Sequence, residues 1–236
     1  MMKLCAHNIV SFVLGVAALV LGPTPGYATQ NLDAEKMGAS LLDAMGGRDV
    51  WSVVRTVHNT AINHHPQARL PYIQEYWFDV EEPAQYLKRD SFDMEIRRAY
   101  TISGGWEKSG DDLDRYSEER LESALNGWEK SLYRKFYLLA KRPDALELVK
   151  AEDGMLEFYL DTEFLGWMMI DEDGAPQRHG GTQSREQYFY FDELAAFGPI
   201  NWPHSGGNLG GWKFEILSIE LLGTPAPVSF APPSAQ

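Results

Sequence analysis

Short segments of alternating polarity, joined by glycine-containing turns, run through most of the chain. In residues 72–80, Tyr76 and Phe78 share one face of an extended strand, and the residues between them face the other way. Asp-Gly pairs at 152–154 and 173–174 separate later segments, because glycine readily adopts the positive φ that hairpin turns need. Parallel strands would need long crossover connections, so this series of hairpins predicts an antiparallel sheet.

We expect about nine to eleven strands in series. In the last of them, strict alternation would place Phe214 and Ile216 opposite Ile219 and Leu221. The glycine- and proline-rich stretch 198–211 is typical of a loop, and the run 206–211 within it is typical of a flexible connection. The expected strands cover residues 53–64, 72–80, 85–92, 94–102, 145–151, 155–161, 164–171, 176–178, 184–192 and 212–222.

Two segments have helical spacing instead. Residues 31–45 place Met37, Leu41 and Met45 on one face, and Gly46 follows as a helix-ending glycine. Residues 111–140 repeat apolar side chains at helical spacing and predict a longer helix. Together the segments predict an α+β fold, in which a large curved antiparallel sheet forms an unclosed half-barrel and helices cover its concave face. An apolar cavity can remain between the sheet and the helices.

The N-terminus has the pattern of an export signal. Lys3 precedes an apolar run at 9–21, which is too short for a comfortable membrane span, and small residues suit cleavage after Ala28. An uncleaved N-terminal anchor is the alternative. We therefore expect a signal peptide at 1–28, a single half-barrel domain at 29–236, and a periplasmic or otherwise exported location.

Cys5 is the only cysteine, and it precedes the apolar run. A lipoprotein needs its cysteine at the cleavage point, so we expect a product that is not lipidated. The mature chain would have no disulfide, no cysteine metal ligand and no thiol nucleophile. No later segment is apolar enough to span a bilayer, so we expect no transmembrane segment in a soluble mature chain.

The charge balance excludes some partners. The chain has 21 Lys and Arg against 34 Asp and Glu, which gives a formal net charge of −13. Binding to nucleic acid needs a positive field that neutralises phosphates, so we expect no nucleic-acid partner. Adsorption to anionic membranes through charge is disfavoured for the same reason.

The order of elements resembles the exported lipoprotein-localisation carrier superfamily, the unclosed half-barrels of the LolA, LolB and LppX type. The resemblance would span nearly the whole mature chain, and it implies that a lipid or other amphiphile binds between sheet and helices. It transfers no site residue to this chain. The segments that carry it are LLDAMGGRDVWSVVRTV, GGWEKSG, MMIDEDGAPQR, YFYFDELAAFGPINWP and SFAPP.

A histidine-based metal site is the low-ranking catalytic alternative. His58 and His64 have the same parity in the first expected strand, His65 is adjacent, and Glu75 lies on the next strand. The chain has no HExxH pair that would fix two imidazoles together on a helix. We expect no metal site and no cofactor.

Other catalytic signatures are incomplete. The acidic pairs border turns, where carboxylates usually cap or face solvent, and no G-x-S-x-G nucleophile motif is present. The glycine-rich run 206–211 lacks the Lys and Ser or Thr of a phosphate-binding loop. We therefore expect a protein that is not an enzyme.

Aromatic residues are the strongest functional signal, at 12% of the chain. They can fill a core or line a cavity, and the sequence leaves both possibilities open. We predict an exported carrier or binding protein for a lipid or other hydrophobic molecule. The alternative is an envelope protein-interaction or sensing module on the same scaffold, without lipid transport. The predicted pocket residues are Tyr76, Phe78, Trp106, Trp128 and Trp212.

Overall fold

The first half of the chain forms a series of antiparallel hairpins. The computed structural model describes residues 25–151 and 154–233, without the side chains of 25–31 and Met94. Each strand pairs with the next along the chain. The strands are β1 (Thr56–His64), β2 (Tyr72–Asp79), β3 (Ala84–Ser91), β4 (Met94–Thr101), β5 (Gly104–Ser109) and β6 (Asp112–Arg115).

The second half of the chain supplies seven further strands to the same sheet. A separate two-stranded ribbon of β12 (Leu194–Phe197) and β13 (Ile200–Pro203) interrupts them. The others are β7 (Leu146–Lys150), β8 (Met155–Leu160), β9 (Glu163–Ile170), β10 (Pro176–Gly180), β11 (Phe189–Phe191), β14 (Ser205–Asn208) and β15 (Lys213–Leu222).

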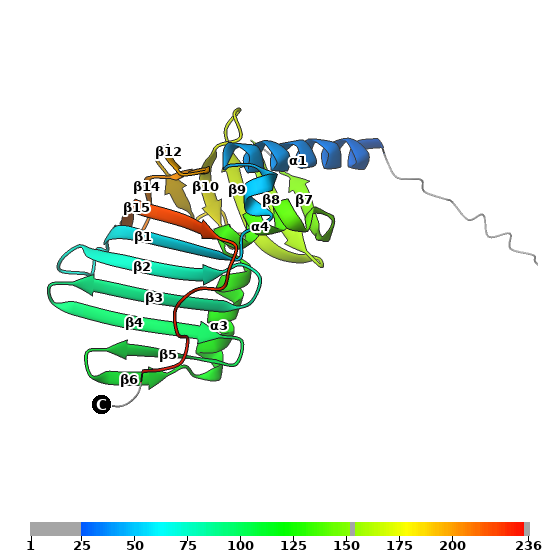
Figure 1. Cartoon of the computed structure of the whole chain (residues 1–236). Helices are drawn as coiled ribbons and strands as arrows, with labels where there is room; N and C mark the ends of the chain where they lie inside the picture. Colours follow the sequence, from blue (N-terminus) through cyan, green and yellow to red (C-terminus); the bar gives the residue numbers. More distant parts are fainter. Residues whose placement is uncertain (1–24, 152–153, 234–236) are drawn as a thin grey trace, which may run out of the picture.

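Thirteen strands form one open antiparallel sheet, in the order β6-β5-β4-β3-β2-β1-β15-β14-β11-β10-β9-β8-β7. The first and last strands of the chain, β1 and β15, pair near the middle of this order. Figure 1 shows the broad lower part of the sheet, from β15 to β6, set at an angle to the upper part from β10 to β7. This architecture confirms the expected α+β fold with a large unclosed antiparallel sheet.

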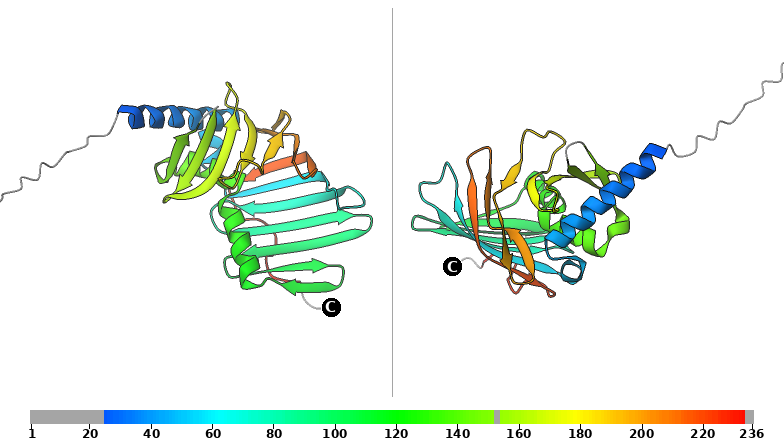
Figure 2. Two further views of the ribbon diagram at one scale, coloured as in Figure 1. Left: turned by 180° about the vertical axis from the view of Figure 1, so that it is seen from behind. Right: turned by 90° about the horizontal axis from the view of Figure 1, so that it is seen from above.

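In the part of the chain that the structure describes, four helices pack against the sheet. They are α1 (Pro25–Ala44), α2 (Arg48–Trp51), α3 (Glu118–Glu129) and α4 (Leu132–Lys141), followed by a short 3₁₀ turn at Pro143–Ala145. Helix α1 packs on β7 and β8. Figure 2 shows from behind that α3 lies across the lower strands on one face of the sheet. Within the described residues, no helix is both long and apolar enough to cross a membrane.

The expected helix at 111–140 is wrong in two respects. Its first residues form β6, which pairs with β5 over Asp112–Arg115. The remainder is two helices, because Ser117 and Ser131 each accept a hydrogen bond from the backbone N–H three residues later, at 3.2 Å. A serine at this position satisfies a free N–H at a helix start, so Ser131 begins a new helix.

The expected loop at 198–211, with its flexible connection at 206–211, is also wrong, because these residues contain β13 and β14. Strand β14 runs between β11 and β15 and contains Gly206 and Gly207. A Cβ on Gly206 would lie 2.3 Å from the Tyr190 carbonyl oxygen, and one on Gly207 would lie 2.4 Å from the Trp212 carbonyl oxygen. These glycines therefore allow close strand packing. The strand expected over 184–192 is correspondingly shorter and covers only Phe189–Phe191.

Alternation along β15 is interrupted by a bulge. Ala61 of β1 opposes Ile216, whereas Thr60 opposes Ser218, so Leu217 is the extra residue. The bulge brings Ile216 and Ile219 to the same face, and both are buried. The prediction that these two isoleucines face opposite ways is therefore wrong.

The core lies between the concave face of the sheet and helices α2 and α4. Trp51 is fully buried and stacks on Phe136 of α4 at 5.1 Å between ring centroids. Trp202 of β13 lies 5.1 Å from the Tyr133 ring. Burial of such rings stabilises the fold by about 1.5–3 kcal/mol each, and it holds α4 firmly against the sheet.

The C-terminal segment crosses the opposite, outer face. The Thr56 hydroxyl donates to the Thr224 carbonyl, and the Trp106 indole donates to the Phe230 carbonyl, each at 2.8 Å. Figure 1 shows this red segment running over β1 to β5. The predicted signal peptide at 1–28 lies almost entirely outside the described residues and stays a prediction.

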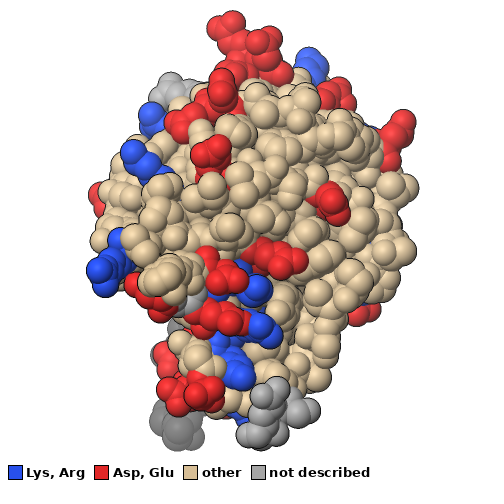
Figure 3. Space-filling view, turned by 60° about the vertical axis from the view of Figure 1, so that its left-hand side comes forward, with Lys and Arg blue, Asp and Glu red and all other residues tan. Residues whose placement is uncertain are grey.

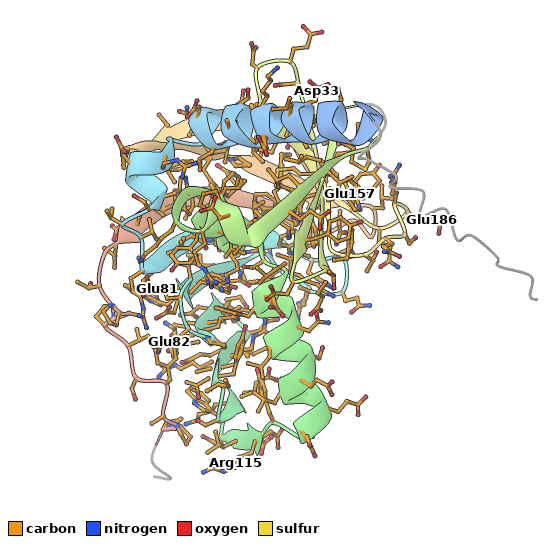
Figure 4. All side chains as sticks on the ribbon, turned by 90° about the vertical axis from the view of Figure 1, so that its right-hand side faces the viewer. Asp33, Glu81, Glu82, Arg115, Glu157 and Glu186 are labelled. Carbon is orange, nitrogen blue, oxygen red and sulfur yellow. The ribbon has the colours of Figure 1, made fainter. Side chains whose placement is uncertain are left out.

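An ion-pair network ties the β2–β3 turn to β1 and α4. The Glu81 carboxylate accepts from Arg55 at 2.7 Å, from the Tyr137 hydroxyl at 3.1 Å, and from Lys141. The Lys141 hydrogen bond is the main cause that lowers the pKa of Glu81 to about 2, and Arg55 and Tyr137 add to it. Figure 4 shows Glu81 beside Glu82, whose carboxylate contacts Arg55 at 3.1 Å.

Candidate functional site

A cavity of about 550 Å³ lies between the concave face of the sheet and the junction of α3 and α4. Residues of β3 and β4 line one side, and residues of β10 and β11 line another, although these strands are far apart in the order of the sheet. The sheet therefore curls around the cavity. The volume is in the range of small-molecule sites, about 300–1,000 Å³.

One wall of the cavity is aromatic. Phe189 and Phe191 come from β11, Phe214 lies in β15, and Trp212 immediately precedes that strand. The Trp212 ring lies 5.2 Å from Phe214 and 5.6 Å from Phe189. Phe189 is 36% exposed and Phe191 is 9% exposed, so this wall extends from the surface into the interior.

The wall formed by β2 and β3 combines apolar surface with hydrogen bonds. The hydroxyls of Tyr76 and Tyr100 both donate to the Gln85 amide oxygen, at 3.1 and 3.0 Å. Burial raises the pKa of Tyr76 well above its usual value, so its hydroxyl stays protonated. The Leu87 side chain lies next to Tyr76 across the strand pair. This wall offers fixed hydroxyl and amide groups beside apolar surface.

Helix α4 closes the cavity from the other side. Leu132 and Tyr133 at its start line the cavity. The Asn59 amide of β1 donates to the Tyr133 hydroxyl, and burial raises the pKa of that hydroxyl. This bond links the helix to the centre of the sheet, so the position of α4 sets the depth of the cavity.

His179 adds a titratable group to the lining. Its ring stacks on Phe189 at 5.0 Å and on Phe191 at 5.4 Å between centroids. Burial, with a contribution from the nearby Lys135 ammonium, lowers the pKa of His179 to about 3. The imidazole is therefore neutral at physiological pH and belongs to the aromatic wall.

Two arginines complete the lining. Arg89 of β3 and Arg98 of β4 are half-buried on the concave face. Arg98 and Gln85 also border a neighbouring cavity of about 320 Å³ beneath α3. The cavity therefore has a cationic region on β3 and β4 and an aromatic region on β11 and β15.

The structure separates the five residues predicted to line a pocket. Tyr76 and Trp212 line the cavity. Phe78 and Trp128 pack on each other in the core, at 6.3 Å, and the Trp128 indole donates to the Asp79 carbonyl at 2.6 Å. Trp106 lies on the outer face beneath the C-terminal segment. That any of the five contacts a ligand stays a prediction.

Several lining residues were missed from the sequence, above all Arg89, Arg98, Tyr133 and His179. The signal for the arginines was present in the alternation. Arg89 shares parity with Leu87, and Leu87 pairs directly with Arg98 on the next strand. An arginine in register with apolar residues on a covered face is unusual enough to indicate a site.

The histidines of the metal-site alternative do not come together. His58 lies on the outer face, stacked on Trp77 at 3.7 Å, with its Nε2 3.3 Å from Glu75. His64 is exposed at the end of β1, and His65 lies at the cavity. Among the described residues, no group of three or more His, Cys, Asp or Glu side chains could hold a metal ion.

Charged side chains on the surface are mixed in sign. Figure 3 shows acidic and basic side chains interspersed around a broad uncharged area, with no continuous basic surface on the face drawn. The fields of neighbouring opposite charges largely cancel at a distance in salt solution. The two cavity arginines therefore act locally, on a molecule that is acidic as a whole.

Comparisons with known proteins give distant structural likenesses. No family model matches the sequence, and no curated protein is similar to it. A DUF1329 family protein from Desulfovibrio piger is similar in structure, with a TM-score of 0.45 and 11% identity over 80% of this chain and 93% of the other. MucB has a TM-score of 0.24 and 12% identity over 86% of this chain and 64% of its own. Neither likeness bears on a ligand, so the site must carry the functional assignment.

Proposed function

We propose that this chain is an exported binding or carrier protein that holds a hydrophobic ligand, such as a lipid, between the curved sheet and its helices. The aromatic-walled cavity of about 550 Å³ is the observation that carries this proposal. Transfer of apolar surface out of water contributes about 25 cal/mol per Å², so an acyl chain could be retained without a chemical step. The predicted leader at 1–28 and the resemblance to half-barrel carriers support export and carriage.

Co-purification tests the proposal most directly. The full chain would be expressed with its leader, purified from the exported fraction, and subjected to native mass spectrometry and organic extraction. We expect an extractable amphiphile at close to one per chain, or uptake when lipids are offered. A ligand-free mass with no uptake would contradict the proposal.

Matched variants locate the bound molecule. Phe214→Asn places an amide in the aromatic wall, and Ala61→Phe fills the cavity from β1, where Ala61 is 3% exposed. Both should reduce ligand content several-fold in folded protein. Phe92→Asn is the control, because Phe92 is 97% exposed in a turn. Equal ligand content in all three would place the ligand elsewhere.

The alternative, an interaction or sensing module, would use the open edges of the sheet for strand addition. The edge strand β6 is exposed along its length, and three of its residues, Asp112, Asp114 and Arg115, are charged. Charged edge strands oppose pairing with another strand. A ligand-free protein that captures a partner through β6 or β7 would favour this alternative.

A further inference from the structure

Arg89 and Arg98 are diagonal neighbours on the concave face. In the β3–β4 register Leu87 opposes Arg98 and Arg89 opposes Ile96, so the two arginines are two residues apart across the strand pair. Diagonal positions of this kind lie about 7–8 Å apart, within reach of long side chains. Both line the cavity. Two guanidinium groups can therefore approach one ligand group.

Neither guanidinium has a carboxylate partner among the described residues. Arg55, Arg97, Arg120 and Arg185 all form ion pairs with Asp or Glu. Glu107 opposes Arg98 across β4 and β5, but it already pairs with Arg120 of α3 at 2.6 Å. The Arg89 Nε donates to the neutral Gln74 amide at 3.1 Å.

The electrostatics of the pair favour a bound anion. Burial and the nearby charge of Arg98 both lower the pKa of Arg89. Two half-buried like charges repel each other and are incompletely solvated, and a shared anion would relieve both effects. Arginine also presents several N–H groups in a planar fork that matches carboxylate and phosphate oxygens.

A neighbouring amide provides a second and independent indication of a ligand. Asn63 is 1% exposed and lines the same cavity, and its Oδ1 has no hydrogen-bond partner among the described residues. Asn63 opposes Tyr72, and the Arg89 guanidinium lies 5.3 Å from the Tyr72 ring centroid. A buried polar atom without a partner costs about 1–3 kcal/mol. Because Oδ1 accepts hydrogen bonds, a hydroxyl or amide N–H of a ligand beside Arg89 would supply that partner.

We infer that the ligand is an anionic amphiphile, whose carboxylate or phosphate head binds Arg89 and Arg98 and whose apolar chain lies along the aromatic wall. This inference rests on the proposed function and specifies its ligand class. The strands between β4 and β15 are about 4.8 Å apart, so head and chain regions are separated by roughly 19 Å along the curved sheet. The Asn63 Oδ1 would accept from a hydroxyl or amide N–H next to the head, and not from the anion itself.

Calorimetric titration with matched probes tests this inference. The probes are dodecanoate, dodecyl phosphate and uncharged methyl dodecanoate, each offered to the full chain at pH 7.5. We expect the wild type to bind at least one anionic probe roughly tenfold to a hundredfold more tightly than the ester. The preferred anion distinguishes a carboxylate head from a phosphate head. Added salt should weaken anion binding more than ester binding.

The variants separate the arginines from general charge effects. Arg89→Gln with Arg98→Gln should remove the preference for the anion and leave ester binding within a few-fold. Arg98→Gln alone should give part of this loss if the double variant does not fold. Arg97→Gln is the control, because Arg97 immediately precedes Arg98 on β4, is exposed on the outer face and pairs with Glu95.

The outcomes distinguish the two proposals. A wild type that binds ester and anions equally well would overturn the anionic head group and leave the hydrophobic cavity intact. An anion preference that survives in the arginine variants would also overturn it. A wild type that binds none of the three probes and carries no extractable ligand would contradict the proposed function itself.

Discussion

Lys135 is buried in a way that disfavours its charge. Its side chain is 1% exposed, and its Nζ donates to the Lys130 carbonyl at the end of α3. Gly166 makes room for it, since a Cβ there would lie 3.2 Å from that nitrogen. Burial is the main cause that lowers the pKa of Lys135 from 10.5 to about 7, and the Lys130 charge adds to it.

Replacing this amine should stabilise the protein most at low pH. Between about pH 7 and 10.5 the unfolded chain holds a proton that folded Lys135 has released, so wild-type stability rises with pH in that window. Lys135→Met lacks this dependence. Its advantage in the free energy of unfolding should therefore shrink by roughly 2 kcal/mol between pH 7 and 9. Urea unfolding at both pH values measures this change, and Lys36→Met is the control, because Lys36 is exposed on α1. If the difference in the free energy of unfolding between Lys135→Met and the wild type were the same at both pH values, the prediction would be wrong.

Glu81 should show the opposite dependence on pH. Because its folded-state pKa is about 2 and its ordinary value is 4.5, its ion pairs stabilise the fold above pH 4.5 and lose that effect as the pH falls toward 2. Glu81→Gln should cost about 1 kcal/mol at pH 7 and little at pH 2.5. Glu82→Gln is the matched control, because the Glu82 side chain is 76% exposed. Equal losses in the two variants would refute a special role for Glu81.

Sequence reasoning at the residue level identified faces but not surroundings. The alternation in 72–80 correctly placed Tyr76 and Phe78 on one face, and both point away from the outer side of the sheet. Tyr76 meets the cavity, whereas Phe78 meets Trp128. The difference depends on where α3 and α4 lie, and neighbouring positions of one strand carry no information about that.

At the scale of elements, β14 depends on the absence of side chains. Gly207→Ala would place a Cβ 2.4 Å from the Trp212 carbonyl oxygen and 2.9 Å from the Tyr190 hydroxyl. We expect a loss of about 1–3 kcal/mol in the free energy of unfolding, because β11 and β15 must move apart. In Gly127→Ala of α3 the new Cβ meets nothing within 4 Å, so that variant should be neutral or gain up to about 1 kcal/mol. Chemical denaturation compares them, and similar values would rule out the steric explanation.

The sequence predicted the end of a helix correctly where its capping residue was recognised. Gly46, with φ of 113°, ends α1 as the sequence predicted. Ser117 and Ser131 carried comparable information about helix starts, and taking them as caps would have divided the expected helix correctly. The bulge at Leu217 had no such signal, because it arises from how β15 pairs with β1.

At the scale of the whole molecule, the two faces of the sheet serve separate purposes. The C-terminal segment lies on the outer face, and the cavity lies on the inner one. A chain that ends at Gly223 lacks the carbonyls that accept from Thr56 and Trp106, so its free energy of unfolding should fall by about 1–2 kcal/mol. Its tryptophan fluorescence should shift to the red, because Trp106 becomes exposed to water. Ligand binding should not change. A chain that ends at Ala231 keeps both carbonyls and is the control; weaker binding by the shorter chain would contradict this separation.

The overall architecture could be predicted only in part. Hairpin turns and alternation are local, and they indicated an open antiparallel sheet with helices on one face. The sheet is two meanders joined where β1 meets β15, a pairing of residues 56–64 with 213–222. Nothing in either segment identifies the other as its partner, because many strands of alternating polarity could pair with the same strand edge.

The pairing of β1 with β15 also sets an order of events during synthesis. Residues 56–115 can form their hairpins as soon as they emerge, but β1 has an unpaired edge until residues 213–222 follow. An unpaired strand edge readily joins another chain. The nascent protein therefore exposes an aggregation-prone strand edge for well over half of its synthesis, and protection by a chaperone or rapid completion of the chain becomes a condition of its yield.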